Sequence, residues 1–169
     1  MRIPKPSNVR VRKATAADAE AILRCLGFAF DAYKSSYTAA GYEDTVLTKQ
    51  SIGRRLKEMS VFVAVESAGE VIGTIACRVD GTEGHLRGMA VLPAWQGCGA
   101  AEELLIHAES ALRSRGCKLI TLDTTEPLQR AMRFYEKHGY RRSGKVGDFF
   151  GMPLIEYVKD VEGQKSRAL

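Results

Sequence analysis

Apolar residues recur along the chain with the two periods that distinguish helices from strands. Strands are predicted where apolar residues alternate with polar ones or form a short run: residues 9–12, 61–66, 71–79, 85–92, 119–124, 140–143 and 154–159. Helices are predicted where apolar residues lie three or four positions apart, on faces formed by Ala19, Ile22, Leu23, Leu26 and Phe30, by Ile52, Leu56 and Met59, by Ala101, Leu104, Leu105, Ala108 and Leu112, and by Leu128, Ala131, Met132 and Tyr135. This order of elements predicts a mixed α/β sheet with helices on both faces.

Turn-forming residues separate these elements and leave one stretch without a regular period. Residues 31–48 are loosely patterned and carry three tyrosines, and a loop that includes residues 147–151 is predicted between the last two strands. The chain has no internal repeat and no second compositional block. We therefore expect a single domain over residues 1–169, with its core at about 9–158 and a frayed tail at 162–169.

Composition and charge narrow the class of protein. The chain has 169 residues, of which 45% are hydrophobic and 27% charged, and its formal net charge is +5. These values are typical of a soluble globular domain, and the scattered positive charge suits an anionic ligand without indicating nucleic acid. The four cysteines stand apart and the three histidines lack metal-ligand spacing, so no metal site is expected. With no signal peptide or membrane-spanning run, we expect a cytoplasmic protein without a membrane partner, either monomer or homodimer.

A glycine-containing loop joins the strand at residues 85–92 to the long helix that follows it. Gly97 and Gly99 allow the backbone to approach a ligand closely, and the first N–H groups of a helix have no partner within it. The helix dipole adds positive potential, so the loop is suited to phosphate or pyrophosphate. A dinucleotide fingerprint would need a third glycine where Glu102 stands, and the chain lacks the Gly-Lys-Ser or Gly-Lys-Thr of a P-loop.

Two sequence blocks resemble the GNAT superfamily of N-acetyltransferases. The spacing Gln96-x-x-Gly99-x-Ala101 is similar to the acyl-CoA signature of that family, and residues 131–140 are similar to its Ala-x-x-Phe-Tyr-x-Lys-x-Gly-Phe block. The resemblance implies a GNAT-like α/β fold. Its mixed, mostly antiparallel sheet would have about six to seven strands flanked by about four helices. Two parallel strands would splay apart, here those at 85–92 and 119–124.

The same resemblance implies the co-substrate and the residues that would bind it. The chain would be an acetyl-CoA-dependent N-acetyltransferase acting on an amine acceptor, with no metal. Backbone groups of Met89, Ala90 and Val91 would hold the pantetheine arm, and the N–H of Val91 or of its neighbour would stabilise an oxyanion. The pyrophosphate would be held by the glycine loop and the first helical turn: Gln96, Gly97, Cys98, Gly99, Ala100, Ala101 and Glu102.

Acid–base roles follow from the same comparison and from side-chain chemistry. Tyr135 aligns with the tyrosine that acts as the family's general acid. Relatives often have a carboxylate that acts as the general base on the strand ahead of Val91. On this strand the chain offers Glu83 and His85 as alternatives. His85 occupies the carboxylate position, and an imidazole of near-neutral pKa can accept a proton. Many relatives have an asparagine where this chain has Leu128, so one polar contact to the coenzyme is absent or supplied elsewhere.

Two functions remain open on the sequence. The first is acetyl transfer to a primary amine of a small molecule or a protein, and the second is a non-catalytic acyl-CoA sensor or interaction module on the same fold. Aromatic residues of the loose stretch and the last hairpin favour an apolar or aromatic element in the acceptor: Tyr33, Tyr37, Tyr42, Phe149 and Phe150. The acceptor itself is not specified by these patterns.

Overall fold

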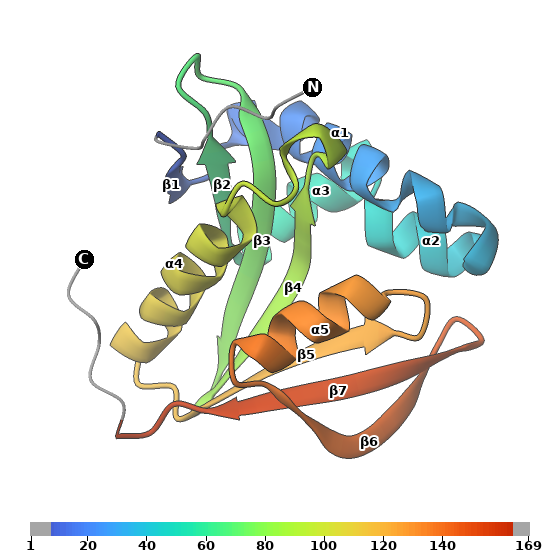
Figure 1. Cartoon of the computed structure of the whole chain (residues 1–169), viewed down its shortest axis with the longest axis vertical. Coiled ribbons are helices and arrows are strands. Elements are labelled where there is room, and N and C mark those ends of the chain that lie inside the picture. Colours follow the sequence, from blue (N-terminus) through green and yellow to red (C-terminus); the bar gives the residue numbers. More distant parts are fainter. Residues whose placement is uncertain (1–7, 164–169) are drawn as a thin grey trace.

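The computed structural model of the chain describes residues 8–163, and these contain seven strands and five α-helices (Figure 1). The strands are β1 Arg10–Lys13, β2 Ser60–Val65, β3 Val71–Asp80, β4 Glu83–Val91, β5 Leu119–Thr125, β6 Arg141–Phe149 and β7 Met152–Asp160. The helices are α1 Ala19–Phe30, α2 Ala39–Val46, α3 Lys49–Glu58, α4 Ala100–Ser114 and α5 Gln129–Lys137.

All seven strands belong to one sheet in the order β1-β2-β3-β4-β5-β7-β6. Every neighbouring pair is antiparallel except β4 and β5, which run parallel. This arrangement confirms the mixed, mostly antiparallel sheet predicted from the sequence. The chain crosses from β4 to β5 through α4, the connection that a parallel pair requires.

Helices cover both faces of the sheet. On one face Gly84 lies so close to Leu112 of α4 that a Cβ at residue 84 would overlap the leucine side chain. On the other face Arg87 of β4 pairs with Asp44 of α2. Residues 84 and 87 are an odd number of positions apart, so their side chains point to opposite faces of the strand. Figure 1 shows α4 and α5 on the near side of the sheet, with α3 passing behind β3.

Strands β4 and β5 pair over only four residues before they separate. The parallel register runs from Glu83 with Leu119 to Leu86 with Leu122. Directly beyond it, the register of β4 against β3 shifts, because two residues of β4, Gly88 and Met89, lie opposite one residue of β3. Gly88 has a φ of 65°, the left-handed conformation typical of the first residue of such a bulge. A bulge bends its strand and increases its twist, which explains why β4 turns away from β5 here.

The last hairpin differs from its prediction. The strands were expected at 140–143 and 154–159, but β6 and β7 extend to a tight turn in which both Phe150 and Gly151 have positive φ. Gly147, which was predicted in the loop, and Gly144, just past the predicted strand, both lie within β6, and Gly144 falls at a register shift. Pairing with β7 therefore outweighs the low strand propensity of glycine.

The stretch at residues 31–48 is more ordered than its pattern predicted. It contains a 3₁₀ helix at Asp31–Ser36 and the helix α2, whose N-cap Thr38 accepts a hydrogen bond from the Gly41 N–H at 3.2 Å. Of the predicted tail, residues 164–169 lie outside the described residues. Among the described helices, none has both the length and the apolar character needed to cross a bilayer.

Candidate active site

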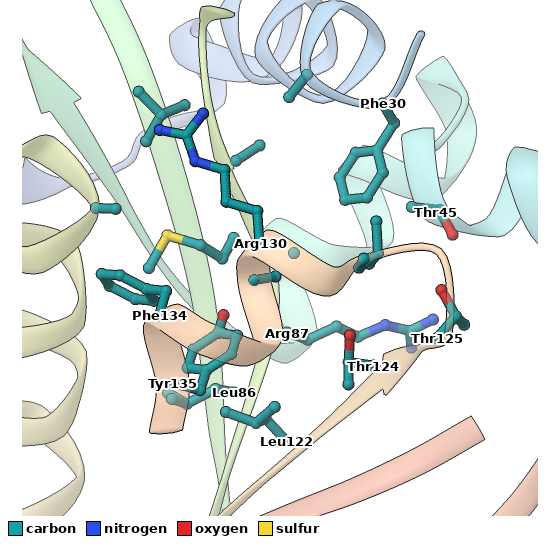
Figure 2. A pocket seen from close by; sticks show the side chains of 18 of the residues that line it. Phe30, Thr45, Leu86, Arg87, Leu122, Thr124, Thr125, Arg130, Phe134 and Tyr135 are labelled. Atoms are coloured by element: carbon teal, nitrogen blue, oxygen red, sulfur yellow. The ribbon is translucent and has the colours of Figure 1, made fainter. Parts of the chain in front are cut away.

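A cleft of ≈ 890 Å³ opens where β4 and β5 separate. Its walls come from both faces of the sheet, because residues of α4 and α5 line it together with residues of α1, α2 and α3. Figure 2 shows this region, with Leu86 of β4 and Leu122 of β5 below the ring of Tyr135. The gap between β4 and β5 can therefore be reached from both faces of the sheet.

The glycine loop ends at the N-terminus of α4, which borders this cleft. Gly97 and Gly99 have φ values of 81° and 90°, and no atom of the described residues lies within 4 Å of a Cβ built on either. Gly99 is the N-cap, and it offers no side-chain hydrogen bond to the helix. The first helical N–H with an acceptor is that of Glu103, so those of residues 100–102 are free within residues 8–163. This end of α4 has the open donors that an anion site needs.

Val91 directs its backbone into the gap between the strands. The next residue, Leu92, donates its N–H to the Ile72 carbonyl at 2.8 Å on the β3 side. Alternate residues of a strand direct their N–H groups to opposite edges, so the Val91 N–H faces the edge that β5 has left. The Val91 carbonyl accepts a hydrogen bond from Gln96 Nε2 at 3.2 Å, and Gln96 Oε1 accepts one from Arg130 at 2.8 Å. Gln96 therefore holds the loop against β4 and α5.

Tyr135 lines the cleft from α5, which lies on the same face of the sheet as α4 (Figure 1). The residue is 7% exposed, and its ring packs edge-on against Phe134 and Tyr140 at centroid distances of 5.3 Å and 5.6 Å. Burial raises the pKa of the Tyr135 hydroxyl, so this group stays protonated at neutral pH. It has no hydrogen-bond partner within residues 8–163, and in Figure 2 it points away from Leu86 and Leu122. A protonated, unpaired hydroxyl in a cleft can donate to a ligand.

His85 lines the cleft from the opposite face of the sheet. Its Nδ1 is 2.8 Å from Thr121 Oγ1, and its Nε2 is 3.7 Å from Asp123 Oδ2. Burial lowers the pKa of His85, although the Asp123 carboxylate opposes that effect, so the imidazole is neutral at neutral pH. Burial also raises the pKa of Asp123. A neutral imidazole next to a carboxylate can accept a proton and then be stabilised as a cation.

The other candidates divide into those inside the cleft and those outside it. Met89 and Ala90 line the cleft beside Val91. Glu83 does not, because it stands at the start of β4 and borders a separate hollow next to β6 and β7. The Cys98 side chain is also outside and packs in the core, with 5% of the residue exposed. Of the two alternatives for the base, the structure brings only His85 into the cleft.

Polar groups without partners show what kind of molecule the cleft can hold. The Thr124 hydroxyl is buried and has no hydrogen-bond partner among the described residues, although Thr124 lines the cleft. Leu128 occupies the N-cap of α5 and offers no side-chain hydrogen bond to the helix. The free N–H groups of α4, the Val91 N–H and this hydroxyl fit the phosphates and amides of a pantetheine coenzyme.

Several residues of the site were not singled out from the sequence, and three of them contact residues that were. Thr121 and Asp123 contact His85 from β5, and Arg130 binds Gln96 from α5. The signal for the first two was a pair of polar residues at alternate positions in the first five residues of a largely apolar strand. Side chains at alternate positions share one face, and β5 was already expected to lie beside the strand of His85.

Comparison with known proteins agrees with this geometry. A profile of the acetyltransferase (GNAT) family matches residues 26–140, which is more than half of the chain. Among similar solved structures is the PaiA N-acetyltransferase from Thermoplasma acidophilum in complex with coenzyme A. The two chains are 18% identical, with a TM-score of 0.75 and coverage of 90% of this chain and 99% of that one.

Two further structures share the fold. The ribosomal-protein-S18-alanine N-acetyltransferase from Escherichia coli is 15% identical, with a TM-score of 0.75 and coverage of 96% of this chain and 99% of that one. An IAA acetyltransferase from Bacillus cereus is 18% identical, with a TM-score of 0.67 and coverage of 91% and 100%. These likenesses establish the fold, and the family match over residues 26–140 shows that the chain belongs to the GNAT family of acetyltransferases, which use acetyl-CoA.

Proposed function

We propose that the chain transfers the acetyl group of acetyl-CoA to a primary amine in this cleft, with His85 as general base and Tyr135 as general acid. One observation carries the proposal. The neutral imidazole of His85 and the protonated hydroxyl of Tyr135 line the same cleft from opposite faces of the sheet, where β4 and β5 separate. An amine can then approach from the α1–α3 side while a thioester lies on the α5 side.

The donors of the cleft are suited to hold acetyl-CoA in one orientation. The pyrophosphate would accept hydrogen bonds from the backbone of residues 97–102, and Arg130 adds a positive charge beside Gln96. The pantetheine arm would lie along residues 89–91, between the separated strands, with the Thr124 hydroxyl as a polar contact. Acetyl-CoA supplies the activated acyl group, and the chain supplies its position.

His85 would take the proton from the attacking amine. Thr121 Oγ1 lies 3.5 Å from the Gly84 carbonyl, to which it donates, so its oxygen accepts from His85 Nδ1–H. This hydrogen-bond assignment leaves the Nε2 lone pair free to receive the proton. The imidazolium that results is then stabilised by Asp123, whose carboxylate oxygen is 3.7 Å from Nε2.

The remaining steps use the backbone of β4 and the side chain of α5. As the amine nitrogen bonds to the acetyl carbon, the negative charge that develops on the carbonyl oxygen would be stabilised by the Val91 N–H. The carbon–sulfur bond then breaks, and the Tyr135 hydroxyl donates its proton to the departing thiolate. A positioned acid or base of this kind contributes about 10²–10⁴-fold to the rate.

A thiol-release assay across classes of amine tests the proposal. The panel should include amino acids, polyamines, aminoglycosides and peptides with a free N-terminus or lysine, each with acetyl-CoA. We expect release of free thiol with at least one class, together with an acetylated amine detected by mass spectrometry. Saturable coenzyme binding without thiol release for any amine would contradict acetyl transfer and favour the non-catalytic acyl-CoA-binding module.

A further inference from the structure

Arg55 of α3 places a guanidinium group in the cleft without a partner. The residue is 8% exposed and lines the cleft beside Arg87. Within residues 8–163 it has neither a hydrogen bond nor an ion pair, and only Asp44 and Arg87 act on it electrostatically. Burial lowers its pKa to about 10, which still leaves the group charged at neutral pH. Buried charges are normally paired, so this one points to a missing partner.

The nearby charges do not neutralise Arg55. Asp44 forms an ion pair with Arg87, so the negative charge of Asp44 is already balanced by that arginine. Among the described residues, only Asp44 and Arg87 act electrostatically on Arg55. Arg78 and Asp123 line the same side of the cleft and act on one another. Arg55 and Arg87 therefore share the one carboxylate of Asp44, and one positive charge is left unbalanced. An anionic ligand group would supply the missing charge.

The position of Arg55 limits where the anionic group of the ligand can lie. A Cβ built on Gly88 would overlap Arg55 Nη1, so the guanidinium rests against the backbone of the bulge. The bulge residue comes directly before Met89, the first residue expected along the pantetheine arm. The contact is on the face of β4 to which Arg87 points, whereas α4 and its glycine loop cover the other face. Arg55 therefore borders the acceptor, not the pyrophosphate.

We propose that Arg55 binds a carboxylate of the acceptor, so that the substrate is an amine that also carries a carboxylate group. This inference rests on the proposed acetyl transfer. The planar guanidinium offers paired N–H donors that match the two oxygens of a carboxylate. Phe30, Tyr33 and Tyr37, which line the same side of the cleft, provide an apolar wall for the rest of the molecule.

Matched pairs of amines test the proposal directly. Each pair consists of an amino carboxylate and the amine left after loss of its carboxylate: phenylalanine with phenethylamine, leucine with 3-methylbutylamine, and 4-aminobutanoate with propylamine. We expect the carboxylate member to have the higher kcat/KM in at least one pair, by about tenfold to a hundredfold through KM, as for other hydrogen bonds to charged groups. Equal efficiency within every pair that turns over would overturn the proposal.

Two variants separate a binding role from a structural one. Arg55→Met keeps most of the side-chain volume, and we expect it to remove the preference for carboxylates without lowering Tm, because it removes an unpaired buried charge. Arg54→Met removes the same charge from the exposed neighbouring position and should leave the preference intact. A preference that persists in Arg55→Met, or a loss of coenzyme affinity in that variant, would overturn the proposal.

A binding measurement keeps this test independent of turnover. If no amine releases thiol, the proposed acetyl transfer fails, and calorimetric titration of the coenzyme A-loaded protein with phenylalanine and leucine still tests Arg55. Weaker binding to Arg55→Met than to Arg54→Met would support the carboxylate contact. Equal binding, or no binding to the unaltered chain, would overturn it.

Discussion

Replacing Tyr135 with phenylalanine should separate catalysis from stability in a single variant. The substitution keeps the ring contacts with Phe134 and Tyr140 and removes only the hydroxyl, which has no partner among the described residues. No hydrogen bond of the folded protein is lost. Because the hydroxyl faces the cleft and makes no hydrogen bond within residues 8–163, the free energy of unfolding should change little. If the hydroxyl protonates the thiolate, kcat should fall by about 10²–10⁴-fold.

Tyr140 provides a matched control in the same cluster. Its hydroxyl donates to the buried Glu109 carboxylate at 3.1 Å and does not line the cleft. Tyr140→Phe breaks that bond, so it should lower the free energy of unfolding by about 1.5–3 kcal/mol with little change in kcat. The two tyrosine variants should therefore differ, one losing activity and the other stability.

The assay combines urea unfolding with steady-state thiol release from an identified acceptor. The pH profile adds a second measurement. Burial raises the pKa of Tyr135 above its usual value of 10.0, and the protonated form is the active one, so activity should fall only above pH 10. That fall should be absent in Tyr135→Phe. A wild-type kcat in this variant, or an equal loss in Tyr140→Phe, would refute the role of Tyr135 as the acid.

Two further substitutions test the base and the anion site. His85→Gln should lower kcat and remove the acidic limb of the kcat/KM profile. In the wild type that limb should lie below pH 6.5, because burial lowers the pKa of His85. If pH–rate measurements show this change in Glu83→Gln instead, the base is the Glu83 carboxylate. Acetyl-CoA at a hundred times its Kd should stabilise the wild type by about 2.7 kcal/mol in a thermal-shift experiment, and Gly99→Glu should abolish that shift. Gly69→Glu introduces the same side chain at a similar φ of 92° in the β2–β3 turn, so it should retain the shift; a retained shift in Gly99→Glu would place the coenzyme elsewhere.

Local pattern predicted most of the elements that position the site. The apolar face of α4 and the glycines before it predicted a helix that starts at a loop suited to an anion, and α4 begins at Ala100. The strand pattern included His85, and the spacing of apolar residues placed Tyr135 on a helix. These features depend on residues close together in the chain, where periodicity and turn chemistry determine the conformation. That the two side chains line one cleft from opposite faces of the sheet emerges only from the structure.

Contacts between distant segments were beyond what the pattern could predict. Arg55 reads as one of several charged residues on an amphipathic helix, and only the folded chain places its guanidinium against Gly88. Asp123 reaches His85 because β5 pairs with β4 in one particular register, which the sequence does not state. The last two strands extend beyond their predicted bounds because β6 pairs with β7, a contact that forms only in the tertiary structure.

A crystal structure of the chain with bound coenzyme A would show directly whether the cleft is the acetyl-transfer site. We expect the pyrophosphate to accept hydrogen bonds from the backbone N–H groups of residues 100–102, and the sulfur to lie between β4 and β5. The sulfur should then be within hydrogen-bonding reach of the Tyr135 hydroxyl. A pyrophosphate bound away from the N-terminus of α4, or a sulfur out of reach of Tyr135, would contradict the proposed site and its mechanism.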